Sequence, residues 1–228
     1  MLYDWILVNK EFLKIAYALA ICFICFVIVL KTDRMFKLSD YQGLRYFRNS
    51  FFFYGLGFFT RFILGDIPLF SEASIYFFNI KFFFEFFMVV AGFFLLYSLV
   101  WKNIEKEKSH NSLLNMKANI FYVVAFLATL LDSLFGISSF MYASQIILFL
   151  AMSVVGYRKL RDGDESSTFS KYYFFIIVLG LIAWVINALL EYVFDWNKLV
   201  QIGVYGINFL FFFFFLYAII KIVGRKNG

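Results

Sequence analysis

The sequence is poor in residues that break helices, bind metals or form cross-links. Its 228 residues include one proline, one histidine and two cysteines. His110 lies in a polar stretch and cannot alone supply the histidine or cysteine clusters that haem and zinc sites need. Cys22 and Cys25 form a single CxxC pair without a second pair, so we interpret them as small packing residues on one helix face. We therefore expect no cofactor and no metal site.

Long polar segments are also missing, whereas apolar residues are abundant. The chain is 63% hydrophobic with 36 phenylalanines, well above the roughly 45–50% apolar share of soluble domains. A soluble core could not bury so much apolar surface. We expect one domain, residues 1–228, embedded in a membrane along its length. The N-terminal segment lacks a basic region and a cleavage motif, and Lys31 follows its apolar run, so it is interpreted as a retained span.

Seven hydrophobic stretches reach the roughly 20 residues that a membrane span requires. They cover residues 12–30, 41–65, 74–101, 118–136, 139–157, 172–194 and 199–222. The predicted fold class is therefore all-α: a polytopic integral membrane protein with seven transmembrane helices. Gly136 with Ser138 and Ser139 indicates a tight turn between the fourth and fifth helices.

Lysine and arginine are distributed unequally between the two predicted sides of the membrane. One side receives 16 of the 21 basic residues, mostly between the first and second, third and fourth, and fifth and sixth spans. The positive-inside rule then places the N-terminus outside and the C-terminus in the cytoplasm of a multi-pass cell-membrane protein. This placement also explains the net charge of +6 without a nucleic-acid partner; membrane lipids are the expected partners.

The helices after the first span share a weak pattern. A small residue near mid-helix precedes a polar residue in the second, fourth and sixth stretches: Gly57 and Arg61, Ala125 and Asp132, Gly180 and Asn187. This pattern is consistent with one helix followed by three helical hairpins. Tyrosines beside basic flanks, which also recur, arise in any interfacial belt, so convergence is the alternative.

Polar and small residues recur at intervals of three and four and predict one inward stripe on each of six helices. These stripes include Ser50, Tyr54, Thr129 and Gln145. Small residues in such stripes usually serve close helix packing. Charged residues in a span are functional-site candidates, because a charge in hydrocarbon costs roughly 2.5–3.5 kcal/mol. The candidate ligand- or ion-binding residues all fall in the predicted outer half: Arg61, Lys81, Glu85, Asp132, Asn187, Glu191 and Asn208. We expect them to line an outward-facing polar cavity that aromatic residues close below.

Two alternatives apply to the charged residues. Arg61, Asp132 and Glu191 could instead form a belt of salt bridges near the head groups. Lys81 and Glu85, one turn apart, could satisfy each other, but lysine before glutamate is the weaker order, which favours pairing across helices. Because desolvation favours a neutral carboxyl group, we hypothesise that Glu85 is partly protonated near neutral pH and carries a proton or coordinates a cation.

Several chemistries are excluded. The seventh stretch has no lysine between Lys198 and Lys221, so a retinal Schiff base has no attachment point. No serine lies beside a histidine base in the bundle, and no glycine-rich phosphate loop appears, so we do not expect an enzyme. The sequence favours a transporter or channel for a small solute or ion. The alternative is a ligand-binding receptor or sensor that signals through a separate protein; a homo-oligomer is compatible with either.

Overall fold

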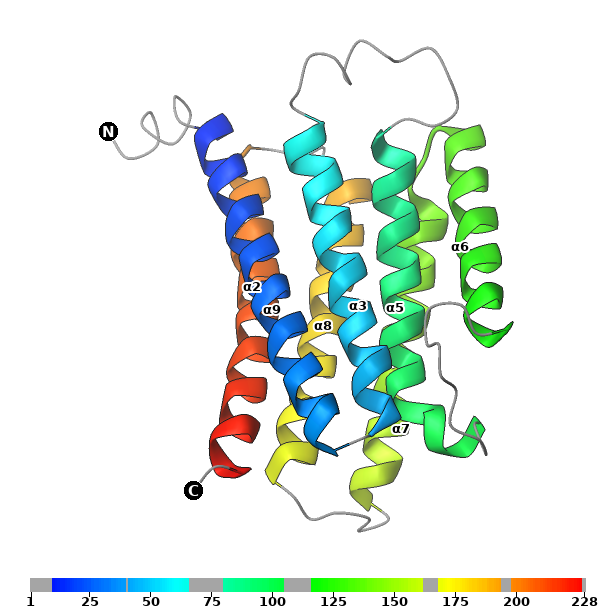
Figure 1. Cartoon of the computed structure of the whole chain (residues 1–228). Coiled ribbons are helices and arrows are strands. Elements are labelled where there is room, and N and C mark those ends of the chain that lie inside the picture. The colour runs from blue at the N-terminus through cyan, green and yellow to red at the C-terminus, as the bar shows by residue number, and fades with distance from the viewer. Residues whose placement is uncertain are drawn as a thin grey trace.

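The computed structural model describes residues 10–39, 41–65, 80–104, 116–161, 168–193 and 198–226. Within these ranges the backbone forms seven α-helices and one π-helical turn, which confirms the all-α prediction (Figure 1). The elements are α2 (Lys10–Ser39), α3 (Gln42–Phe59), the π-helical turn η1 (Thr60–Leu64), α5 (Ile80–Ile104), α6 (Met116–Phe135), α7 (Ser139–Arg161), α8 (Thr168–Val193) and α9 (Lys198–Lys226).

The helices overlap all seven predicted hydrophobic stretches, although individual ends differ by a few residues. The largest difference is in α2, which continues past residue 30 to Ser39. Its last turns contain leucine, lysine, arginine and methionine, which are good helix formers although they are not all apolar. Residues 74–79 of the third stretch lie outside the described residues. Three segments are long and apolar enough to cross a membrane: Phe12–Leu38, Ile80–Trp101 and Ser139–Arg161.

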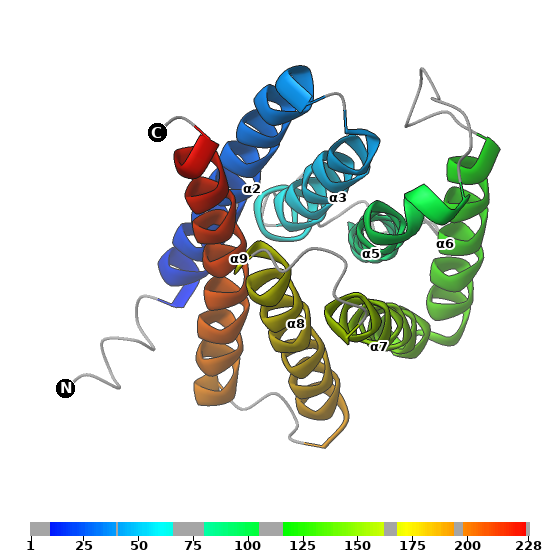
Figure 2. The same ribbon diagram turned by 90° about the horizontal axis from the view of Figure 1, so that it is seen from below.

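Successive helices run antiparallel, and six of them form a closed ring (Figures 1 and 2). Around the ring α2 packs on α3, α3 on α5, α5 on α7, α7 on α8, α8 on α9, and α9 on α2. The remaining helix, α6, lies outside this ring against α5 and α7. The pairs α3–α5, α6–α7 and α8–α9 are thus packed helical hairpins, whereas their sequence repetition stays a prediction.

Aromatic side chains fill the middle of the ring. The Phe51 ring on α3 lies 5.0 Å from that of Phe215 and 6.2 Å from that of Phe212, both on α9. Phe211 on α9 contacts Phe149 on α7 at 5.8 Å. Ring centroids 4.5–7 Å apart are the usual spacing of favourable aromatic pairs. The bundle is therefore packed through its centre in the described residues.

The predicted stripes face inward. Ser50 and Tyr54 on α3, Thr129 on α6 and Gln145 on α7 are all fully buried. The glycines in the stripes permit close packing: a Cβ atom added at Gly92 would lie 3.0 Å from the Gln145 side-chain oxygen. Phenylalanine, leucine, isoleucine and valine dominate the exposed surface, as expected for a face towards lipid.

The turn between α6 and α7 has the predicted tight geometry. Gly136 adopts a φ of 68°, in the left-handed region that glycine enters without a Cβ clash. The Ile137 backbone N–H donates to the Asp132 carbonyl at 3.1 Å and closes the turn. The turn thereby places Asp132 and Ser138 beside the first turns of α5.

Candidate functional site

Charged side chains from three segments meet at the end of the bundle where α3 ends and α5 begins, the upper end in Figure 1. Arg61 comes from η1, Lys81 and Glu85 from the first turns of α5, and Asp132 from the last turn of α6. Lys81 pairs with Glu85 and contacts the Ile137 carbonyl in the turn after Asp132, and Arg61 packs on Phe84, next to Glu85. Four of the seven predicted site residues are thus brought together.

Glu85 is the deepest charged group of this cluster. Its side chain is 2% exposed, and its Oε1 atom has no hydrogen-bond partner among the described residues. Ser138, which follows the α6–α7 turn, lies beside this carboxylate. A buried carboxylate oxygen without a hydrogen bond is costly, because its lost hydration is not replaced. This oxygen is therefore a position where a bound cation or a proton would be stabilised.

Lys81 connects Glu85 with the surface. Its Nζ atom lies 3.7 Å from Glu85 Oε1 and donates a hydrogen bond of 3.1 Å to the Ile137 carbonyl. The Lys81 side chain is 47% exposed. The sequence favoured pairing of Lys81 and Glu85 with other helices over pairing with each other. For the described residues this prediction is wrong, because the Lys81 ammonium group pairs with Glu85 and also contacts the α6–α7 turn. The ion pair is long, so it neutralises the carboxylate incompletely.

Asp132 holds the start of α7. Its Oδ1 accepts a hydrogen bond from the Phe140 backbone N–H at 2.9 Å, and its Oδ2 accepts one from Met141 at 2.8 Å. N–H groups in the first turn of a helix lack partners within the helix, and a carboxylate there also meets the positive end of the helix dipole. Asp132 is completely buried. It therefore contributes to the site by fixing Ser138 and by its negative charge near Lys81.

Arg61 lies in the π-helical turn and packs on aromatic rings. Its guanidinium carbon is 4.6 Å from the centroid of Phe84 and 5.5 Å from that of Phe62. Gly65 N–H donates to the Thr60 carbonyl, the i to i−5 bond that defines the turn. Such turns are rare and frequently occur at functional sites. The sequence contains no clear signal for this feature.

A second polar group joins α8, α9 and α2. Asn187 Nδ2 donates to Asn208 Oδ1 at 3.0 Å, and Asn208 Nδ2 is 3.5 Å from Asn187 Oδ1. Tyr17 lies beside Asn208, and the Tyr17 ring stacks on Tyr205 with the centroids 4.5 Å apart. Sequence reasoning placed the two asparagines in the site but missed Tyr17, whose helix carried no recognised polar stripe. The Tyr17 ring also contacts the ring of Phe62, next to Arg61, at 5.7 Å, which brings this group near the Glu85 cluster.

Gln145 extends the polar path one turn deeper than Glu85. Its Nε2 atom donates to the Met88 carbonyl at 2.6 Å, and its Oε1 atom has no hydrogen-bond partner among the described residues. Gln145 is fully buried. The sequence placed it on an inward stripe without assigning it to the site. The Glu191 side chain lies outside the described residues.

Metal binding by a cluster of protein side chains finds no support in the described ranges. No group of three or more histidine, cysteine, aspartate or glutamate residues there could hold a metal ion. Cys22 and Cys25 are both free thiols. Cys25 is buried and Cys22 half-buried, as expected for packing residues.

Comparison with known proteins gives one partial similarity. The chain is 32% identical over 102 residues to a protein of Archaeoglobus fulgidus named only as an uncharacterized protein. The match covers 40% of this chain and 44% of that protein, so the chain spans less than half the length of this relative. No family model matches the sequence, and no solved structure matches it. The function must therefore be argued from the site itself.

Proposed function

We propose that the chain is a seven-span protein of the cell membrane with its N-terminus outside and its C-terminus in the cytoplasm. Supporting this topology, all seven described helices alternate in direction. The end of the bundle that carries Ser39, Gln42 and Arg161 also carries most of the lysines and arginines. The positive-inside rule assigns that end to the cytoplasm.

We infer further that the protein binds and moves a small ion or solute as a transporter or channel, with a cation or a proton favoured. The observation that carries this inference is the buried Glu85 carboxylate, whose Oε1 atom has no hydrogen-bond partner in the described structure. An ionisable residue inside a membrane span is costly and is retained mainly where ions or protons pass. A bound cation or proton would remove that cost.

The neighbouring side chains suggest how such an ion would enter and proceed. Lys81 is half-exposed and stands between solvent and Glu85, so its movement away from Oε1 would open access to the carboxylate. Beyond Glu85, the unpartnered Gln145 Oε1 offers the next acceptor. An ion could therefore pass from Glu85 to an amide oxygen without an intervening charged group.

The inner half of the bundle is closed by aromatic packing, and this supports the second candidate function. Phe53 stacks on Phe94 with centroids 5.5 Å apart, and Tyr46 meets Tyr97 at 4.6 Å. A site open on one side only also suits a ligand-binding receptor or sensor that signals through a separate membrane-protein partner. Transport requires this aromatic layer to open, whereas sensing does not.

Flux measurements with the purified protein in liposomes test the proposal. We expect an imposed proton or sodium gradient to dissipate faster with wild-type protein than in empty liposomes. Glu85→Gln should abolish the difference, because a neutral amide cannot take up a proton or balance a cation. Asp33→Asn, which neutralises a carboxylate at the opposite end of the bundle, is the matched control and should retain flux.

Two results would contradict transport. Equal flux through wild-type and Glu85→Gln liposomes would remove Glu85 from the pathway. The sensor would be favoured by a different pair of results. Proton, sodium and potassium gradients would dissipate no faster than in empty liposomes, and a cation would raise the melting temperature of the wild-type protein but not of Glu85→Gln.

A further inference from the structure

A groove between α2 and α3 opens on the side of the bundle that faces away from the other helices. It encloses about 300 Å³, and its wall is almost wholly apolar. Phe26, Phe52 and Phe59 at its rim are exposed, whereas Cys25 and Phe51 form its buried floor. Gly55 leaves the middle of the groove free of a side chain. The volume is at the lower end for small-molecule pockets, which suits a slender hydrocarbon chain.

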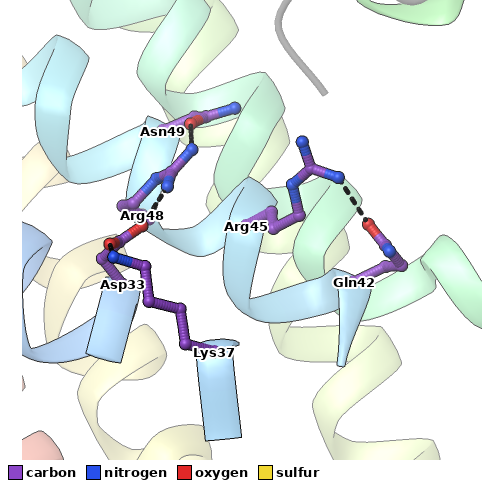
Figure 3. A network of polar contacts seen from close by, with 6 residues as sticks. All are labelled: Asp33, Lys37, Gln42, Arg45, Arg48 and Asn49. Carbon is purple, nitrogen blue, oxygen red and sulfur yellow. Dashed lines mark hydrogen bonds and ion pairs between the residues drawn. The ribbon is translucent and has the colours of Figure 1, made fainter. Parts of the chain in front are cut away.

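A charged network lies at one end of this groove, where α2 ends and α3 begins (Figure 3). Arg48 donates to the Asp33 carboxylate and, through Nη2, to Asn49 Oδ1 at 3.3 Å. Lys37 Nζ is 3.1 Å from Asp33 Oδ2. The Lys37 side chain is 75% exposed and that of Arg48 is 25% exposed, so both remain accessible from outside.

The groove and the network are continuous along both helices. Val29 lines the groove four residues before Asp33, and Phe52 lines it four residues after Arg48. Four residues correspond to about 6 Å along a helix axis. The part of a bound molecule that extends a few atoms beyond this end of the groove therefore reaches the charged network.

The network carries an excess of positive charge. The described residues from 31 to 39 and from 41 to 48 hold one carboxylate, Asp33, and five basic residues: Lys31, Arg34, Lys37, Arg45 and Arg48. Even with Asp40, which lies between these ranges in the sequence, two carboxylates leave an excess of three positive charges. An arginine also has five N–H donors, of which the contacts to Asp33 and Asn49 need only some. The corner can thus accept a further anion.

We propose that this surface binds one anionic phospholipid, with an acyl chain in the α2–α3 groove and the phosphate at Arg48 and Lys37. Only a molecule with a long apolar part and an adjacent anion matches both halves of the surface. The phosphate binds to the donors of Arg48 and Lys37 that the Asp33 carboxylate leaves free. The proposal is independent of the proposed transport, because the groove lies at the periphery of the bundle and none of the residues around Glu85 lines it.

Native mass spectrometry of the delipidated protein in detergent micelles tests the proposal. The two probes are phosphatidylglycerol and phosphatidylcholine with identical acyl chains. We expect the wild-type protein to retain one phosphatidylglycerol molecule more strongly than phosphatidylcholine. Arg48→Gln should lower phosphatidylglycerol retention about fivefold, the size of one interaction between a basic residue and an anionic lipid surface. Arg158→Gln, at an exposed position on α7, is the matched control and should leave it unchanged.

Two further variants keep the test decisive if Arg48→Gln fails to fold. Asp33→Asn removes the only described carboxylate of the corner and should strengthen retention of phosphatidylglycerol. Val29→Phe fills the groove and should weaken retention of both lipids, whereas Val154→Phe on the exposed face of α7 should not. Equal retention of both lipids by the wild-type protein would overturn the proposal. Unchanged lipid retention in Val29→Phe would also overturn the proposal. If the wild-type protein formed a dimer that Val29→Phe lost, the groove would be assigned to a second copy of the chain.

Discussion

Replacing Asp132 with alanine should strongly destabilise the bundle, because both carboxylate oxygens bind the first turn of α7. The substitution removes hydrogen bonds of 2.9 Å and 2.8 Å to the Phe140 and Met141 N–H groups and leaves both donors unpaired. Loss of a capping side chain costs about 0.5–2 kcal/mol, and hydrogen bonds to charged groups contribute about 1.5–3 kcal/mol. We therefore expect the free energy of unfolding to fall by about 2–3 kcal/mol.

Unfolding of the purified protein by dodecyl sulfate in mixed micelles, followed by circular dichroism, measures this change. Asp132→Asn keeps one acceptor oxygen and should lose about half as much stability. Leu131→Ala, at the neighbouring exposed position, is the control for the loss of side-chain volume. If Asp132→Ala were no more destabilising than Leu131→Ala, the carboxylate would not be holding α7, and its contribution to placing Ser138 beside Glu85 would be refuted.

Three further sets of substitutions test the packing around the site by the same unfolding measurement. Gly92→Ala should lower the free energy of unfolding by about 1–3 kcal/mol, because the new methyl group would press on Gln145 and Leu148. Gly203→Ala, where a methyl group has open space, is the control and should raise the free energy of unfolding slightly. Equal effects of the two substitutions would contradict the close approach at Gly92. Alanine substitutions of Asn187 and Asn208, singly and together, should give a coupling of about 0.6 kcal/mol, typical for membrane helices, and additivity would exclude the amide pair. Ser50→Ala should cost about 0.5–1.5 kcal/mol by removing a buried 2.8 Å hydrogen bond to a carbonyl of α5, and an unchanged midpoint would show that this bond contributes nothing.

The positions of the helices could be predicted from the sequence because hydrophobic length and a period of 3.6 residues are properties of the chain itself. Ser50, Thr129 and Gln145 were assigned to inward faces by spacing alone, and all three are buried. The convergence of Arg61, Lys81, Glu85 and Asp132 could be expected because each lies near a helix end on the same side of the predicted bundle.

The detailed contacts depend on tertiary structure and were not predictable. The sequence indicates that Asp132 lies in a span, but only the left-handed turn at Gly136 directs its carboxylate to the start of the next helix. The π-helical turn at Thr60–Leu64 has no signature that distinguishes it from a regular helix end. Tyr17 joins the polar group only because α2 packs on α9, a contact between distant parts of the chain.

The length of α2 has a consequence for the kind of membrane that the protein prefers. Its 30 residues extend about 45 Å, whereas a typical hydrocarbon core is about 30 Å thick. In the membrane topology that we propose, the ion pair of Asp33 with Arg48 would hold the ends of α2 and α3 at a common level. In a thicker bilayer α2 can stand more upright, while in a thinner one it must tilt more or draw the lipid around it. Hydrophobic mismatch would therefore act first on the α2–α3 corner and could sort the protein among membranes of different thickness.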